Sequence, residues 1–350
     1  MKLCTWVTLL FLLFHFGIQA QTSITGMVKD SLNTPLPFVT VYLSKTTIGT
    51  LTNDKGVYAL TIPRDGVYEM IFSCVGYKSI SKIITAKGIK QTIDIKLSEN
   101  TILLNEFTVN EKDKNREKFY SKFVNSFIGK TPNSYSCKII NPKDIYIYND
   151  YQSKLLKAYS LNPLIIENKA LGYTVIFDLT EFQYDLKTEH LRFSGNSYFK
   201  TLIGNPKQEI RWERNRLNAY YGSRTHFLRA LFSDSLNQEN FEIGEFEIDH
   251  LTKVWSAIKP IKVVYGSSVL NKKSLTVYHD KEIVIKYKDP ESIFIGYSPR
   301  IHLSYISFND SLKVFQNGYC GDSYHVTWGG EMADERIADM LPFDFMPKKR

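Results

Sequence analysis

The chain has 350 residues, a formal net charge of +8 and 23% charged residues. Its length exceeds what one hydrophobic core usually serves, so we expect more than one domain. The positive excess is mild, and the sequence contains no basic tail and no arginine-rich arm of the kind that follows a phosphate backbone. Length, composition and charge therefore argue against nucleic acid as a partner.

The amino terminus has the pattern of a cleaved signal peptide. Lys2 precedes an apolar run over residues 6–18, and the segment ends on the small residue Ala20. A transmembrane anchor is the alternative, but it needs roughly 20 apolar residues. The only nearby cysteine, Cys4, precedes the apolar run, which argues against a lipid anchor. We expect a mature chain that begins at Gln21, has no transmembrane segment, and is exported to the periplasm or associated with the outer membrane.

Three cysteines remain after cleavage, namely Cys74, Cys137 and Cys320. Their separations fit no metal-binding knuckle, and an odd number allows at most one internal bridge. A disulfide between Cys137 and Cys320 is one prediction, because both lie in the second predicted domain and the compartment is oxidising. Three buried free thiols are the alternative.

Residues 23–97 read as short strands with alternating side chains, separated by turn residues. The clearest turn lies within residues 49–60, where Asn53 can close a turn through its side chain. Gly56 can then adopt the positive φ that other residues resist. About six strands at this spacing predict a small β-sandwich.

Several motifs in this region resemble one domain family. They are Gly26-x-Val28-x-Asp30, Pro35-Leu36-Pro37, Gly49-Thr50-x-Thr52-Asn53-x-x-Gly56-x-Tyr58 and Phe72-Ser73-Cys74-Val75-Gly76-Tyr77. In this order they resemble the carboxypeptidase-regulatory-like domain that is common in exported proteins of Bacteroidota. The resemblance implies a transthyretin-like (prealbumin-like) β-sandwich that is not itself catalytic. Such domains are attached to metallocarboxypeptidases or precede the plug of TonB-dependent receptors.

A domain boundary is expected near residue 100. Residues 110–116 are charged or polar throughout, which is typical of a linker. We therefore divide the chain into a signal peptide at 1–20, a sandwich at 21–99, a linker at 100–116 and a second domain at 117–350. The fold class is mainly β, with the sandwich followed by an α+β domain.

The second domain is predicted to combine an antiparallel sheet with a helical pair. An amphipathic helix is expected over residues 114–128, followed by strands over 136–148, 154–159, 173–184 and 192–202. Asn205-Pro206 has the pattern of a helix cap followed by proline at the first position, and Ser223 can cap a second helix. The apolar face of the first of these helices is predicted to carry Ile210, Leu217, Tyr220 and Tyr221.

These two helices carry the densest group of cationic and aromatic side chains in the chain. The candidate ligand-binding residues are Arg211, Trp212, Arg214, Arg216, Tyr220, Arg224, His226 and Arg229. Guanidinium groups pair bidentately with carboxylate or phosphate, and an indole face stacks on a sugar or a cation. One interpretation is a site for an anionic or glycan ligand, or for an envelope protein. The other is that the aromatic side chains fasten the helices to the sheet while the arginines face solvent.

The stretch from Trp212 to Arg229 is also similar to a recurring element of longer Bacteroidota proteins that carry the regulatory-like domain. Weaker similarity covers Ala170-Leu171-Gly172-Tyr173 and Leu341-Pro342-Phe343. The resemblance implies no settled role for these residues.

One pair of residues has the spacing of a zinc site. His279 and Glu282 form a His-x-x-Glu pair, and His302 or His325 could be a third ligand. The flanking residues 274–278 and 283–287 alternate as two strands, which predicts a hairpin with this pair on a solvated turn. We therefore expect no metal there and no cofactor elsewhere.

The function expected from the sequence is that of a non-catalytic exported envelope protein with a binding or scaffold role. The alternatives are a hydrolase or metallocarboxypeptidase-like enzyme with an unrecognised site in the second domain, and a component associated with a TonB-dependent receptor.

Overall fold

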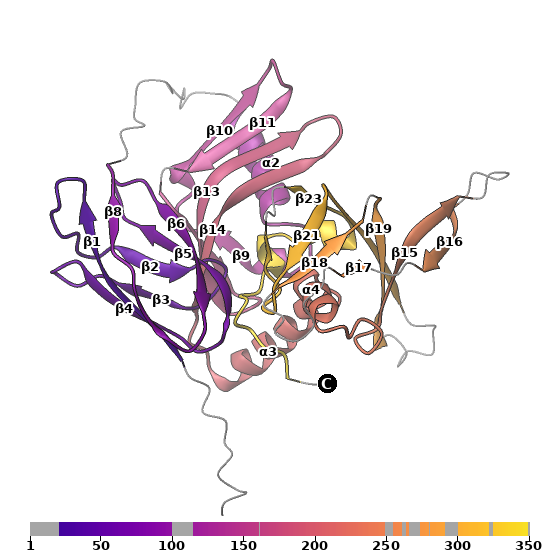
Figure 1. The fold of residues 1–350 in the computed structure, drawn as a ribbon. Helices are drawn as coiled ribbons and strands as arrows, with labels where there is room; N and C mark the ends of the chain where they lie inside the picture. Colours follow the sequence, from indigo (N-terminus) through magenta and orange to yellow (C-terminus); the bar gives the residue numbers. More distant parts are fainter. Residues whose placement is uncertain are drawn as a thin grey trace, which may run out of the picture.

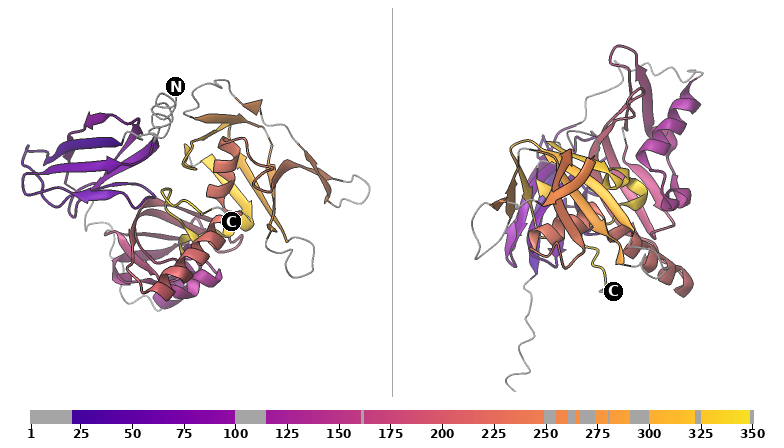
Figure 2. Two further views of the ribbon diagram at one scale, coloured as in Figure 1. Left: turned by 90° about the horizontal axis from the view of Figure 1, so that it is seen from below. Right: turned by 90° about the vertical axis from the view of Figure 1, so that its right-hand side faces the viewer.

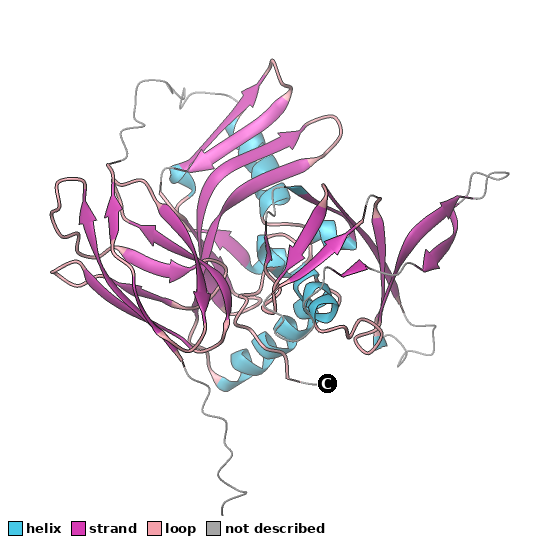
Figure 3. Cartoon of the chain, viewed as in Figure 1, coloured by secondary structure: helices cyan, strands magenta, loops and turns pink. Residues whose placement is uncertain are grey.

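The computed structural model describes residues 21–99, 115–160, 162–248, 255–260, 264–265, 274–279, 281–290, 300–321 and 325–348. The predicted signal peptide and all but the end of the predicted linker lie outside these residues. The fold is mainly β, with a few helices (Figure 3). Its three hydrophobic clusters define an N-terminal sandwich, a central sheet and a C-terminal unit, which lie side by side (Figures 1 and 2).

The N-terminal sandwich consists of two sheets packed face to face. Its strands are β1 (Thr22–Asp30), β2 (Thr40–Leu43), β3 (Gly49–Leu51), β4 (Val57–Ile62), β5 (Gly66–Ser73), β6 (Ile80–Ala86), β7 (Lys90–Thr92) and β8 (Ile95–Leu97). One sheet has the order β4-β1-β7, with β8 also on β1, and the other has the order β3-β2-β5-β6. Alternate residues of β4, namely Tyr58, Leu60 and Ile62, are buried between the sheets. The predicted β-sandwich is confirmed.

Two glycines explain part of the sequence pattern of the sandwich. Asn53 Oδ1 accepts the backbone N–H groups of Lys55 and Val57, each at 3.0 Å, and Gly56 has φ +71°, as the turn prediction required. A Cβ atom at Gly26 would lie 1.9 Å from the Ile93 carbonyl oxygen. Only glycine therefore allows β1 to approach the Ile93 backbone this closely.

The central sheet is antiparallel and has the order β10-β11-β13-β12-β9, with β14 on β13. Its strands are β9 (Cys137–Ile139), β10 (Ile145–Asp150), β11 (Leu155–Ser160), β12 (Leu164–Asn168), β13 (Tyr173–Asp185) and β14 (Leu191–Thr201). Helix α2 (Arg116–Phe127) packs on it through Phe123 and Phe127, which are fully buried. The antiparallel sheet and the helix are as predicted, whereas β12 was not anticipated. The single strand predicted over residues 136–148 is wrong, because the 3-10 helix Pro142–Asp144 divides it into β9 and β10, which lie at opposite edges of the sheet.

The C-terminal unit contains two further sheets, with orders β16-β15-β19-β20-β23 and β17-β18-β21-β22. The strands are β15 (Phe241–Ile248), β16 (Trp255–Pro260), β17 (Val264–Tyr265), β18 (Leu275–Tyr278), β19 (Ile283–Lys288), β20 (Ile301–Phe308), β21 (Ser311–Val314), β22 (Cys320–Gly321) and β23 (Val326–Gly330). The predicted hairpin of β18 and β19 is wrong. β18 pairs with β17 and β21, while β19 pairs with β15 and β20. The two strands therefore belong to different sheets.

Two consecutive helices, α3 (Pro206–Tyr220) and α4 (Arg224–Phe232), follow the central sheet. Both begin where the sequence predicts, since Asn205 and Gln208 form a capping box and the Ser223 side chain accepts the His226 N–H. The predicted inward face of α3 is partly wrong. Ile210 is 72% exposed, and Trp212 occupies the buried position instead.

The last part of the chain, residues 331–348, runs across all three units and is called the C-terminal strap. It begins with the 3-10 helices Glu331–Asp334 and Ile337–Asp339, and Ile337 and Ala338 enter the core of the central sheet. Farther along, the Phe343 N–H donates to the Lys45 carbonyl of the sandwich at 2.7 Å. The strap therefore links segments that are far apart in sequence (Figure 1).

A second direct contact joins the sandwich to the central sheet. The Lys45 N–H donates to the Ser197 carbonyl at 2.6 Å, and the Phe199 N–H donates to the Thr46 carbonyl at 2.9 Å. These bonds extend the edge strand β14 onto the turn after β2.

Candidate functional site

Helix α3 is fixed to the central sheet by Trp212. The indole Nε1–H donates to the Lys169 carbonyl at 2.8 Å, and the side chain is 2% exposed. A Cβ atom at Gly172 would lie 2.4 Å from the Trp212 ring, and one at Gly204 would lie 2.5 Å from it. Gly172 also has φ +71°. Glycine at both positions therefore lets the indole lie flat against the backbone.

Two polar residues of α3 reinforce this attachment. Asn215 donates to the Ala170 carbonyl at 2.9 Å, and Arg216 Nε donates to the Leu171 carbonyl at 2.7 Å. The Arg216 guanidinium also lies 4.3 Å from the centre of the Tyr173 ring. The Ala170-Leu171-Gly172-Tyr173 segment is thus the surface on which α3 is bound.

His226 is buried between the helices and the C-terminal unit. Its Nδ1 accepts the Gly222 N–H at 3.1 Å, and its Nε2 lies 3.1 Å from Glu239 Oε2. Because Nδ1 accepts a hydrogen bond, the proton belongs on Nε2, which then donates to the carboxylate. The ring also packs against Tyr220 and Phe241, at centroid distances of 4.9 and 4.8 Å. Both ring nitrogens have partners within the chain.

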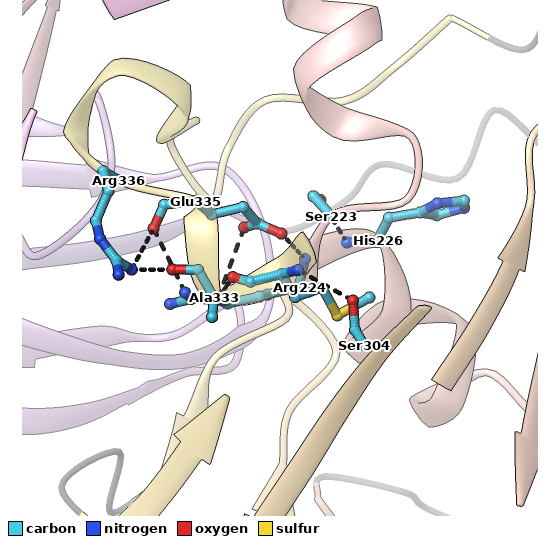
Figure 4. A network of polar contacts seen from close by, with 8 residues as sticks. Ser223, Arg224, His226, Ser304, Ala333, Glu335 and Arg336 are labelled. Carbon is cyan, nitrogen blue, oxygen red and sulfur yellow. Dashed lines mark hydrogen bonds and ion pairs between the residues drawn. The ribbon is translucent and has the colours of Figure 1, made fainter. Parts of the chain in front are cut away.

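Arg224 connects the start of α4 to the C-terminal strap (Figure 4). Its backbone N–H donates to Glu335 Oε1 at 2.7 Å, and its Nε donates to the Met332 carbonyl at 2.6 Å. Burial raises the pKa of Glu335 to about 7, although the nearby Arg224 guanidinium opposes this shift. Burial also lowers the pKa of Arg224. The pair is a partly desolvated junction whose carboxyl group titrates near neutrality.

Arg229 holds the far end of the strap. Its Nη2 donates to the Phe343 carbonyl at 2.8 Å, its Nη1 to the Phe345 carbonyl at 3.1 Å, and its Nε to the Asn317 carbonyl at 3.2 Å. The guanidinium also lies 5.5 Å from the centre of the Tyr220 ring. Its planar fork thus joins α4, the strap and the turn before β22.

Arg211 and Arg214 lie on the opposite side of α3. Both are exposed, and neither makes a hydrogen bond or ion pair with any residue that the structure describes. Lys207 is exposed in the same way one turn earlier. The predicted ligand-binding residues are therefore not one site. Trp212, Arg216, Tyr220, Arg224, His226 and Arg229 contact the chain itself, whereas Arg211 and Arg214 face solvent.

The other predicted residues lie elsewhere. His279 Nε2 is 3.4 Å from Glu245 Oε1, while Glu282 is exposed. Within the described ranges, no group of three His, Cys, Asp or Glu side chains could hold a metal ion. The disulfide predicted between Cys137 and Cys320 is not formed, and both residues are free thiols, as is Cys74. Cys137 lies in β9 and Cys320 in β22, which pack against different hydrophobic clusters.

Glu335 and the C-terminal strap were not identified from the sequence as parts of this arrangement. The available signal was the similarity that linked residues 212–229 to the 170–173 and 341–343 segments. The structure brings all three together, through Arg216 on one side and Arg229 on the other. The three segments that the sequence similarity covers are therefore segments that contact one another in the fold.

A small recess lies where the sandwich, the strap and the turn before β22 meet. It is lined by Ser44, Lys45, Val67, Tyr68, Glu69, Asn317, Tyr319 and Phe343. The Asn317 side chain donates to the Val67 carbonyl there at 3.1 Å. These residues form an internal contact between units.

No helix in the described part of the chain is both long enough and apolar enough to cross a membrane.

Comparison with solved structures gives only distant similarity. A 3-chlorocatechol 1,2-dioxygenase from Rhodococcus opacus 1CP is 11% identical with a TM-score of 0.20, over 23% of this chain and 61% of that chain. A minor pilin of Streptococcus agalactiae is 14% identical with a TM-score of 0.21, over 25% of this chain and 48% of the pilin. The Bacillus anthracis TIE protein is 12% identical with a TM-score of 0.21, over 53% and 32% of the two chains. The match thus spans less than two thirds of each of these proteins.

A comparison with curated proteins gives no match. A comparison with family models does give one. Residues 24–109, about a quarter of the chain, match the CarboxypepD_reg-like domain. This range contains the two-sheet sandwich from the third residue of β1 through β8. The N-terminal part of the chain is therefore similar to the CarboxypepD_reg-like domain.

Proposed function

We propose that this protein is a non-catalytic component of the cell envelope that presents a cationic surface to an anionic or glycan-containing envelope partner. In this proposal the first 20 residues direct export and are removed, so that the mature chain begins at Gln21. The regulatory-like domain supports an extracytoplasmic location, in the periplasm or at the outer membrane.

The observation that carries the proposal is the division of the α3 side chains into two faces. Trp212 and Arg216 fix one face to the central sheet. Arg211 and Arg214 are exposed on the other face, without partners among the described residues. A rigid helix that displays unpaired guanidinium groups is suited to binding carboxylate or phosphate groups.

The rest of the structure supports a scaffold role. The C-terminal strap is bonded to the sandwich at Lys45, to the central sheet at Asn168 and to the helices at Arg229. In addition, the Thr47 backbone N–H donates to Asp344 Oδ1 at 2.9 Å. These contacts hold the three units together, so that α3 keeps its orientation relative to the sandwich.

Retention of the purified chain on washed envelopes tests this proposal. We expect the Arg211→Gln/Arg214→Gln variant to lose retention, because it removes the unpaired charges and keeps helix-forming side chains. The Lys118→Gln/Lys130→Gln variant is the matched control, since it removes two exposed cations, one in α2 and one in the turn that follows it. Equal retention of both variants would contradict the proposal.

A further inference from the structure

The exposed face of α3 combines cations with apolar side chains. Lys207, Arg211 and Arg214 recur at intervals of four and three residues, which places them on one side of the helix. Ile210 lies beside them and is 72% exposed, and Ile203, just before the helix, is fully exposed. We call these five residues the α3 outer face. Its four residues within α3 lie on the side of the helix opposite Trp212, which anchors the helix.

Nearby carboxylates do not neutralise this face. Glu209 Oε1 accepts the Gly204 N–H at 3.0 Å, so this side chain turns back over the first turn of α3. Glu213 lies 3.7 Å from Lys348 Nζ, so its charge is already paired with the strap. The α3 outer face therefore carries three positive charges and no acidic side chain.

The two isoleucines distinguish this surface from an ordinary solvated helix. An exposed isoleucine is common by itself. Here Ile210, between Lys207 and Arg211, and Ile203, just before the helix, add apolar side chains to three cations that have no partner among the described residues, which makes an amphipathic surface. Cations near an anionic bilayer gain electrostatic free energy, while apolar side chains gain from entering the headgroup region. A soluble carboxylate or phosphate ligand would contact the cations but would gain nothing from the apolar isoleucine side chains.

We propose that the α3 outer face binds the surface of an anionic phospholipid bilayer. This inference rests on the proposed envelope function and names the partner of its cationic surface. The helix lies along the bilayer, with the cations at the phosphate groups and Ile203 and Ile210 at the boundary of the acyl region. Its anchored side, at Trp212, faces the rest of the protein.

Sedimentation of the envelope-purified chain with lipid vesicles tests the proposal. Vesicles of phosphatidylcholine with about 30% phosphatidylglycerol are compared with vesicles of pure phosphatidylcholine at low ionic strength. We expect binding to the anionic vesicles only, and weaker binding as salt screens the charges. Each cation is expected to contribute about fivefold to the partition coefficient, so the Lys207→Gln/Arg211→Gln/Arg214→Gln variant should bind on the order of 100-fold more weakly.

A second variant tests the apolar contribution separately. Ile203→Ser/Ile210→Ser keeps every charge, and we expect it to weaken binding to anionic vesicles roughly tenfold. Ile83→Ser/Ile89→Ser removes two exposed isoleucines of the sandwich and should have no effect. A matched set of exposed cations outside the α3 outer face is changed in the charge control, Lys118→Gln/Lys130→Gln/Lys143→Gln.

Thermal unfolding verifies that every variant is folded. If a variant is not folded, the single substitution Arg211→Gln replaces it, and we expect this substitution to lower the partition coefficient about fivefold. Equal binding to neutral and anionic vesicles, or unchanged binding of both α3 variants, would overturn the inference. If the chain ignores vesicles but is still retained on native envelopes through Arg211 and Arg214, the partner is a protein or glycan. In that case the membrane inference fails and the proposed function stands.

Discussion

Arg229 provides the sharpest test of how the strap is held. Replacing Arg229 with alanine removes three hydrogen bonds to carbonyl groups, two of them on the strap. Hydrogen bonds from a charged group contribute about 1.5 kcal/mol or more each, so the three bonds together contribute about 4–5 kcal/mol. Because the side chain is only partly buried, water can solvate some of the released carbonyls. We therefore expect the strap to be destabilised by about 3 kcal/mol.

Hydrogen–deuterium exchange of the strap measures this destabilisation directly. A loss of about 3 kcal/mol in local opening should accelerate exchange of residues 341–348 by about 100-fold. Arg229→Lys, whose ammonium group cannot reproduce the planar fork, should show a smaller acceleration. Arg214→Ala is the control, since this exposed side chain has no partner among the described residues. An acceleration below about fivefold in Arg229→Ala would show that Arg229 does not hold the strap.

Three further predictions concern backbone geometry, pH and the thiols. In thermal unfolding, Gly172→Ala should destabilise the chain by more than about 3 kcal/mol, because the new Cβ atom meets the Trp212 ring at a position with left-handed backbone. Gly76→Ala is the control: Gly76 has φ +85° but open space around it, so this variant should lose only about 1–2 kcal/mol. Folded Glu335 keeps a proton that the unfolded chain releases, so the free energy of unfolding should fall by up to about 3 kcal/mol as pH rises from about 4.5 to 7. In urea titrations, Glu335→Gln should reduce the change of the free energy of unfolding with pH. The same pH dependence in this variant as in the wild type would contradict the role of Glu335. A reducing agent should leave the melting temperature unchanged, since the structure has only free thiols at its described cysteines; a drop would indicate a bridge.

The sandwich and the helix starts could be predicted because their signals are local. Asn53 and Gly56 determine a turn through their own bonding and backbone preference. Asn205 and Ser223 cap α3 and α4 through residues that are three positions away. Such short-range chemistry is visible in a single sequence.

The failures concern contacts between distant segments. β18 and β19 are adjacent and alternate as hairpin strands do, but they do not pair with each other. β18 pairs with β17 and β21, and β19 pairs with β15 and β20. Ile210 looked like part of the apolar face of α3, but Trp212 had the stronger tertiary contact with Gly172. Pairing and burial of this kind depend on the assembled fold.

The candidate site shows both outcomes. The sequence drew attention to residues 211–229 as a candidate site, but it could not separate the arginines that bind the chain from those that face solvent. Arg224 and Arg229 are bonded to residues more than 80 positions away. Only the fold could reveal that Arg211 and Arg214 have no partner among the residues that the structure describes.

Fractionation of cells that produce the tagged chain tests whether Arg211 and Arg214 hold the protein at the envelope. We expect the wild-type chain and the Lys118→Gln/Lys130→Gln control to sediment with the envelope, and we expect the mature chain to begin at Gln21. The Arg211→Gln/Arg214→Gln variant should shift to the soluble extracytoplasmic fraction while remaining folded. A wild-type chain in the cytoplasm, or a variant that stays with the envelope as the wild type does, would contradict the proposed function.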